Sequence, residues 1–195
     1  MEKETFSPGQ IVALLKTADR DWSGMVLFAY NAGARLSDAA NLKWSNLDVA
    51  NGIITYQEQK TGAKATIGLH PDFLDWLSEQ PVPEHADAPV FPSLAGKAIG
   101  GTVGLSTEFT KLVAKAGIQN RLLRTGNSGK GRKVSALTFH SLRHSAATKV
   151  FNQAALKEIA RRVTNHATGG SLNTYLHEDL TAIKEAVNLI PRLPR

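Results

Sequence analysis

Hydrophobic residues recur at helical spacing over most of the chain. The first such segment, IVALLKTA, follows Ser7, Pro8 and Gln10, a pattern that predicts a helix with a capping box at its start. Gly33 and Gly117 are placed to end two later helices. The segments with helical periodicity are 24–33, 36–44, 72–80, 106–117, 140–152, 155–163 and 170–188.

A different pattern, the alternation of β-branched and polar residues, occurs in IITYQE (53–58) and ATIGL (65–69). The polar, glycine-containing loop between them carries Lys60 near its turn, so we expect a small antiparallel hairpin or sheet. The stretch 81–101, rich in Pro, Ala and Gly, is typical of an ordered connection. With 195 residues and 42% hydrophobic content, the chain is expected to form one α+β domain over residues 1–195, mainly helical with a small antiparallel sheet.

Composition excludes several classes of function. The chain has no cysteine, which rules out disulfides and thiolate metal sites and is compatible with the cytoplasmic location that we expect. No apolar run is long enough for a membrane span or a signal peptide, so no membrane partner is expected. The six histidines are scattered without HExxH spacing, so we expect no metal and no cofactor.

Positive charge is concentrated in one part of the chain. The net charge is +6, and the segment 109–157 contains ten Lys or Arg residues but no Asp or Glu. Phosphate contacts by such residues dominate nucleic-acid affinity, so the segment indicates double-stranded DNA as a partner. Its glycine-rich part, RTGNSGKGRKVS (124–135), predicts a mobile loop that orders over a backbone phosphate. The plainer alternatives are a solvated basic surface for the whole segment and a plain flexible loop for its glycine-rich part. The candidate DNA-binding residues are Arg124, Lys130, Arg132, Lys133 and Lys149.

Candidate chemistry begins with HSLRHS (140–145), which places His140 and Arg143 three residues apart and therefore on one face of a helix. Both side chains could then contact one phosphate. Arginine offers a planar fork of donors that matches two phosphate oxygens, and histidine can give or take a proton near neutral pH. Two more candidate cations are Arg35, which opens a helix-like segment, and Lys60 in the expected hairpin.

Taken in order, these motifs resemble the catalytic domain of the tyrosine recombinases, also called the phage integrase family. GARLSDAANLKWSNLD resembles the first arginine box, QKTG the lysine hairpin, HSLRH the second arginine box and VTNHATGGSLNTYLH the last box. The 23 residues from Arg143 to His166 and the nine from His166 to Tyr175 are usual distances in the family. Two motifs differ from the common pattern: Gly33-Ala34-Arg35 stands in place of Gly-Leu-Arg, and Thr164-Asn165-His166 in place of Leu-Gly-His.

The resemblance implies a set of catalytic residues and a reaction. The set is Arg35, Lys60, His140, Arg143, His166 and Tyr175. The two arginines would clamp the phosphate, the first histidine would accept the phenolic proton or hydrogen-bond the phosphate, and the lysine would protonate the leaving 5′ oxygen. The tyrosine would become joined to the 3′ phosphate without ATP or a metal. The implied function is site-specific DNA cleavage and rejoining between two duplexes.

The resemblance also bears on domains and assembly. Many family members carry an additional helical, core-binding domain before this point, and we expect it to be absent from this chain. The amphipathic segment EDLTAIKEAVNLI, after Tyr175, could dock on its own domain or on a neighbour. A homo-oligomer on DNA, formed through this C-terminal helix, is therefore one expectation.

Plainer roles remain open for the same residues. Arg35 could form a surface ion pair with Asp38, Lys64 could replace Lys60 as the reactive lysine, and Tyr175 could simply pack a terminal helix. The side chains expected to be structural or exposed are Tyr30, Tyr56, His70, His85, His144 and His177.

Alternative functions remain open as well. A type IB topoisomerase would use similar chemistry on one duplex. A non-catalytic DNA-binding module derived from an integrase would keep the basic segment for affinity alone. A metal-dependent integrase with three carboxylates is disfavoured, because the Asp and Glu residues lie mostly in helix starts and loops.

Overall fold

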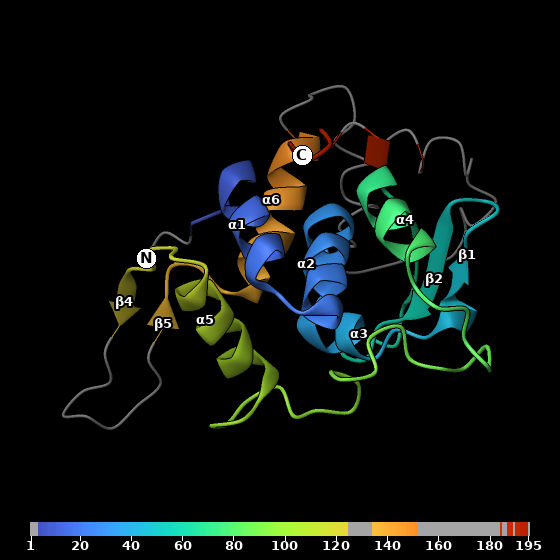
Figure 1. Ribbon diagram of the computed structural model, residues 1–195, viewed down its shortest axis with the longest axis horizontal. Helices are drawn as coiled ribbons and strands as arrows, with labels where there is room; N and C mark the ends of the chain where they lie inside the picture. Colours follow the sequence, from blue (N-terminus) through green and yellow to red (C-terminus); the bar gives the residue numbers. More distant parts are fainter. Residues whose placement is uncertain (1–3, 125–133, 152–183, 185–186, 189, 195) are drawn as a thin grey trace.

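The computed structural model describes residues 4–124, 134–151, 184, 187–188 and 190–194. Its architecture is mainly helical, with a three-stranded antiparallel sheet at one end and a two-stranded sheet at the other (Figure 1). This confirms the expected fold class. The predicted helix 155–163 and nearly all of the predicted helix 170–188 lie outside the described residues.

Helix caps are found where the sequence predicts them, but the helix predicted over 24–33 begins earlier, at Arg20, and the one predicted over 36–44 ends earlier, at Ala40. The first helix, α1 (Pro8–Thr17), has the expected capping box, in which Ser7 Oγ accepts from Gln10 N and Ser7 N donates to Gln10 Oε1 at 2.9 Å. Gly33 ends α2 in the left-handed conformation, at φ 66°. The remaining bounds are α2 (Arg20–Ala32), α3 (Leu36–Ala40), η1 (Trp44–Asn46), α4 (Pro71–Ser78), α5 (Leu105–Lys115) and α6 (Phe139–Phe151).

The core is built around α2, which is buried along almost its whole length. It packs against α1, α4 and α6, so it lies at the centre of the molecule (Figure 1). A Cβ at Gly24 would lie only 2.4 Å from the indole ring of Trp76, which shows how closely α2 and α4 approach. The buried hydrophobic side chains of α2 explain why the sequence pattern there is continuous rather than amphipathic.

The expected hairpin is part of a sheet of three strands in the order β1 (Leu47–Asp48), β2 (Ile53–Gln57), β3 (Lys64–Gly68). Strands β2 and β3 pair antiparallel from Ile53 opposite Gly68 to Gln57 opposite Lys64. The loop that joins them contains Lys60, as the sequence predicts. Strand β1 was not predicted, because two residues are too short to show an alternating pattern.

A second, two-stranded sheet corrects the interpretation of 124–135 as a loop throughout. β4 (Leu122–Arg124) pairs antiparallel with β5 (Val134–Ser135), so both ends of that segment belong to strands. Residues 125–133 lie outside the described part of the chain. The expected connection 81–101 is ordered, with Val90, Phe91 and Leu94 fully buried. No helix among the described residues is long and apolar enough to cross a membrane.

Candidate active site

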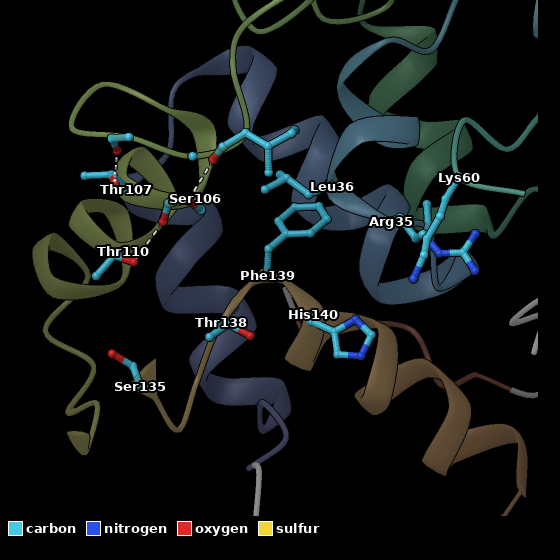
Figure 2. A pocket seen from close by; sticks show the side chains of 14 residues that line it. Arg35, Leu36, Lys60, Ser106, Thr107, Thr110, Ser135, Thr138, Phe139 and His140 are labelled. Atoms are coloured by element: carbon cyan, nitrogen blue, oxygen red, sulfur yellow. Dashed lines mark hydrogen bonds between the residues drawn. The ribbon is translucent and has the colours of Figure 1, made fainter. Parts of the chain in front are cut away.

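A hollow with a volume of about 1030 Å³ opens between the hairpin loop, the start of α3, α5 and the start of α6. Arg35 and Lys60 lie on one side of it, hydroxyl side chains lie on the other, and His140 lies between them (Figure 2). The structure thus brings together three candidate residues that are far apart in the sequence. The lining residues are Ala34, Arg35, Leu36, Lys60, Ile99, Gly100, Gly101, Ser106, Thr107, Thr110, Ser135, Thr138, Phe139 and His140.

Arg35 is presented by a turn between two helices. Helix α2 ends at Ala32, and Gly33 N donates to Ala29 O at 2.9 Å while its own backbone turns into the left-handed region. Arg35 then caps α3 in an extended conformation, at φ −74° and ψ 154°. Only glycine adopts the left-handed conformation without a steric penalty, so the Gly-Ala-Arg sequence itself determines where the guanidinium emerges.

Two buried carboxylates hold the Arg35 guanidinium. Its Nη1 forms an ion pair with Glu58 Oε1 and lies 3.9 Å from Asp38 Oδ2. The hydrogen bond that Arg35 donates to the Glu58 carboxylate raises the pKa of Arg35 above its ordinary value, so the guanidinium stays charged. The pair with Asp38 therefore exists, but the expectation that it lies at the surface is wrong, because the Asp38 side chain is fully buried.

Arg143 approaches the same region from the interior. It is 2% exposed, and its Nη1 donates to Gly33 O at 2.7 Å. Burial, and then the nearby positive charge of Arg35, lower the pKa of Arg143 from its ordinary value. His140, one turn earlier on α6, is exposed and lines the hollow. The two side chains thus differ in exposure, and Arg143 is not among the residues that line the hollow.

Lys60 extends from the β2–β3 loop into the hollow. The loop is closed by Glu58 N donating to Ala63 O at 2.9 Å and Gly62 N donating to Glu58 O at 2.8 Å. Lys64, the alternative reactive lysine, begins β3 and does not line the hollow. Of the two lysines in the hairpin, Lys60 is the one that faces Arg35 and His140 (Figure 2).

Three of the hydroxyl side chains that line the hollow are bonded to main-chain carbonyls. Ser106 Oγ donates to Ile99 O at 2.7 Å, and Thr107 Oγ1 donates to Gly101 O at 2.8 Å. Thr110 Oγ1 donates to Ser106 O at 2.9 Å. Because these protons are already used on main-chain carbonyls, the hydroxyls fix the loop before α5 rather than offer donors to an anion.

Sequence reasoning missed Glu58 and Thr61, and it considered Asp38 only as a surface ion-pair partner of Arg35. One signal was present: Glu58 follows Ile54 and Tyr56 at every second position, and both of those are buried. Alternation along β2 therefore turns the Glu58 side chain inward. A carboxylate at an inward-facing strand position requires a partner, and a nearby candidate cation supplies it.

Several predicted site residues either do not line the hollow or lie outside the described residues. His166, Tyr175, Lys130, Arg132 and Lys133 fall outside them, as does His177. Arg124 ends β4, and Lys149 lies within α6.

The other polar and aromatic residues expected to be structural or exposed are found so. His70 is buried and caps α4, and His85 is exposed. Tyr30 and Tyr56 are buried. His144 is partly buried, with its ring edge-to-face with the His140 ring at 4.5 Å between centroids. The described residues contain no group of three or more His, Cys, Asp or Glu side chains arranged to hold a metal ion.

Comparison with known proteins identifies the family. The Phage integrase family pattern matches residues 4–181, so the chain belongs to the Phage integrase family. A probable integrase/recombinase protein of Methanocaldococcus jannaschii is 25% identical over 174 residues, which are 88% of this chain and 49% of that protein. The chain therefore spans about half the length of this curated relative.

Solved structures share the fold. The integrase from mycobacterium phage Brujita superposes with a TM-score of 0.67 at 16% identity, covering 98% of this chain and 59% of that one. The lambda integrase catalytic core superposes with a TM-score of 0.54 at 20% identity, covering 85% of this chain and 96% of that core. At these identities the likeness concerns the fold, a mainly helical domain with a small antiparallel sheet.

Proposed function

We propose that this chain is the catalytic domain of a site-specific DNA recombinase or integrase, which cleaves and rejoins DNA through a 3′-phosphotyrosyl intermediate. The observation that carries the proposal is the convergence of Arg35, Lys60 and His140 on one hollow, with the buried Arg143 close enough to Arg35 for their charges to interact. Three cationic or proton-transferring groups of different type around one hollow suit a phosphodiester better than a neutral substrate.

Each group has a task that its position suits. A phosphodiester resists attack because its oxygens repel nucleophiles and its alkoxide is a poor leaving group. Arg35, partly exposed in the hollow, would bind a non-bridging oxygen, and the buried charge of Arg143 would add to the positive potential. His140 would accept the phenolic proton of Tyr175 or hydrogen-bond the phosphate. Lys60 would give a proton to the leaving 5′ oxygen.

Tyr175 would be the nucleophile. A phenol with a pKa near 10 is a weak nucleophile at neutral pH, so the positive potential of the site would serve to favour its ionised form. The resulting ester conserves the free energy of the phosphodiester, and a 5′ hydroxyl of another strand can reverse the step. His166 would add a hydrogen bond to the same phosphate.

Double-stranded DNA is the proposed partner. Lambda integrase, whose catalytic core shares this fold, has been solved as a tetramer bound to a Holliday junction. The basic stretch of this chain would supply the phosphate contacts through Arg124, Lys130, Arg132, Lys133 and Lys149, and so give binding a steep salt dependence. Assembly of several copies on DNA through the C-terminal helix belongs to the same proposal.

The test is capture of the covalent intermediate. A suicide DNA substrate with a nick next to the cleavage site should form a denaturant-resistant adduct with the wild-type chain. Tyr175→Phe should form none, whereas Tyr30→Phe, which removes a buried hydroxyl, should keep the adduct if it folds. EDTA should leave the yield unchanged.

Three results would speak for other functions. Tight DNA binding without an adduct would favour a non-catalytic DNA-binding module. Relaxation of a supercoiled plasmid without exchange between duplexes would favour topoisomerase-like activity. Loss of the adduct on chelation would contradict the metal-independent mechanism.

A further inference from the structure

We propose that Glu58 is a positioning residue that fixes the Arg35 guanidinium and the loop of Lys60 relative to each other. This inference rests on the proposed function, because it assigns a role in strand cleavage. It concerns a carboxylate that lies outside the hollow and would not touch the DNA. Its two oxygens contact different parts of the site, and each part carries one of the proposed catalytic cations.

The two oxygens of the Glu58 carboxylate contact different residues. Glu58 Oε1 forms the ion pair with Arg35 at the start of α3. Glu58 Oε2 accepts a hydrogen bond of 2.6 Å from Thr61 Oγ1, and Thr61 directly follows Lys60 in the loop. The Glu58 side chain therefore connects Arg35 to Thr61, the neighbour of Lys60.

The electrostatics favour an ionised Glu58. The residue is only 2% exposed, and its burial raises the pKa of the carboxyl. The contacts with Arg35 and Thr61 outweigh that effect, so the pKa lies below its ordinary value. A buried carboxylate is tolerated only when its charge and lone pairs are matched, which makes both partners of Glu58 necessary to its position.

A second carboxylate anchors the other side of the loop. Asp38 Oδ1 accepts from Gln59 N at 3.0 Å, and Gln59 directly precedes Lys60. The residues before and after Lys60 are thus both tied to carboxylates that also face Arg35. The lysine side chain itself remains exposed and directed into the hollow.

This arrangement predicts that loss of the Glu58 carboxylate impairs two tasks together, phosphate binding by Arg35 and proton donation by Lys60. An arginine that loses its carboxylate partner samples more rotamers, and a loop that loses its anchor moves its lysine. Displacement of a reacting group by about 1 Å costs on the order of 100-fold in rate. We therefore expect Glu58→Gln, which keeps the size but removes the charge, to slow adduct formation by roughly 100-fold. Glu58 is absent from the lining of the hollow, so DNA affinity should change little.

Modified DNA substrates separate the two tasks. A methylphosphonate at the cleavage site removes one negative charge and lessens the need for Arg35. A 5′-bridging phosphorothiolate leaves as a stable thiolate and lessens the need for Lys60 as an acid. Thr61→Val should slow cleavage of ordinary DNA by about tenfold and be rescued by the phosphorothiolate alone. Glu58→Gln should be rescued in part by each substrate.

Matched variants control for charge and folding. Thr61→Ser keeps the hydroxyl and should retain the wild-type rate. Asp48→Asn removes a carboxylate from the same sheet, where its partner is Asn51, and should not change the rate on any of the three substrates. A Glu58→Gln defect of equal size on all three substrates would show a general loss of structure and would overturn the proposed role.

A measurement without DNA keeps this inference separate from the proposed function. In heteronuclear NMR, the Nε–H resonance of Arg35, assigned by its loss in Arg35→Lys, should show a restrained side chain in the wild-type chain. Glu58→Gln should shift and broaden this signal, whereas Asp48→Asn should not. An unchanged Arg35 signal would overturn the positioning role even if cleavage were slower. A changed signal in a chain that forms no adduct would support the positioning of Arg35 and count against the proposed function.

Discussion

Arg143 donates a 2.7 Å hydrogen bond to the main-chain carbonyl of Gly33, and this bond joins the interior of α6 to the turn at which α2 ends. Arg35 follows that turn by two residues and leads into α3. One of the two proposed clamp residues therefore supports the backbone that presents the other. The two boxes, more than a hundred residues apart in the sequence, depend on each other in the fold.

Removal of the Arg143 side chain should lower stability as well as activity. Arg143→Ala leaves the Gly33 carbonyl without this donor and opens a cavity beside α2, which together should cost about 2–4 kcal/mol of the free energy of unfolding. Arg143→Lys should recover part of that loss but not the adduct, because an ammonium lacks the planar fork. Urea unfolding and adduct yield measure the two effects.

An exposed arginine provides the control for this prediction. Arg121→Ala removes a guanidinium that is 66% exposed and pairs with Glu4. The loss should stay below about 1 kcal/mol, since exposed ion pairs contribute little. Equal losses for the variants of Arg121 and Arg143 would contradict the structural role assigned to the Gly33 contact.

Gly33 should not tolerate a side chain. Its φ of 66° costs an L-residue about 1–2 kcal/mol, so Gly33→Ala should lower the free energy of unfolding by that amount. Any relaxation of the turn would move Arg35, and adduct formation should slow as well. Gly9→Ala, in the first turn of α1 with open space around the new Cβ, should be neutral or stabilising by up to about 1 kcal/mol. Thermal unfolding of both variants tests whether Gly33→Ala lowers the free energy of unfolding while Gly9→Ala leaves it unchanged or raises it.

Titration of the phenols should distinguish Tyr175 from the other two tyrosines. Burial, followed by the charge of Asp72, raises the pKa of Tyr30 to about 12, and burial raises the pKa of Tyr56 as well. Neither should ionise in the folded chain below about pH 11. Ultraviolet absorbance should therefore show one phenol titrating at or below the ordinary pKa of about 10, and Tyr175→Phe should remove that step.

The same pKa shifts set the alkaline limit of stability. A folded-state pKa above the unfolded value favours the neutral phenol, so the contribution of Tyr30 is complete below about pH 10 and is lost as the pH rises towards 12. Circular dichroism should show the chain folded over the range in which Tyr175 ionises. The prediction fails if no phenol of the folded chain titrates below about pH 11.

His70 should hold the C-terminal residues against α4. Its Nδ1 accepts from Asp72 N at 3.2 Å, so the ring proton resides on Nε2, which donates to Ile190 O at 2.8 Å. His70→Ala should cost about 1–2 kcal/mol through loss of the helix cap and this bond. Exchange of the Leu193 amide proton, which donates to Asp72 Oδ2 at 3.0 Å, should become faster.

A nearby surface ion pair offers the comparison for His70. Arg192 pairs with Asp72 and Asp75, and its side chain is about half exposed. Arg192→Ala should therefore cost less than about 1 kcal/mol. If Arg192→Ala speeds exchange at Leu193 more than His70→Ala does, the buried histidine does not anchor this segment.

Local elements and the identity of the candidate cations could be predicted from the amino-acid sequence. The capping box at Ser7, the glycine that ends α2 and the alternation in β2 and β3 are local patterns, and each is present in the structure. Arg35, Lys60 and His140 could also be proposed from motifs alone, since residue type and spacing carry that chemistry. Short strands such as β1 and β4 could not be predicted, because two or three residues are too few to show an alternating pattern.

The contacts that hold the site together could be seen only in the folded chain. Glu58 looks like an ordinary acidic residue until folding brings the end of the hairpin to Arg35, and only the fold shows that Asp38, the partner of Arg35 considered from the sequence, is buried. The spacing of three residues predicted that Arg143 and His140 share a face of α6. The packing of α6 on α2 instead directs Arg143 inward to Gly33. Burial and long-range pairing arise from the packing of distant segments, whereas helix caps and alternation depend on neighbours in the chain.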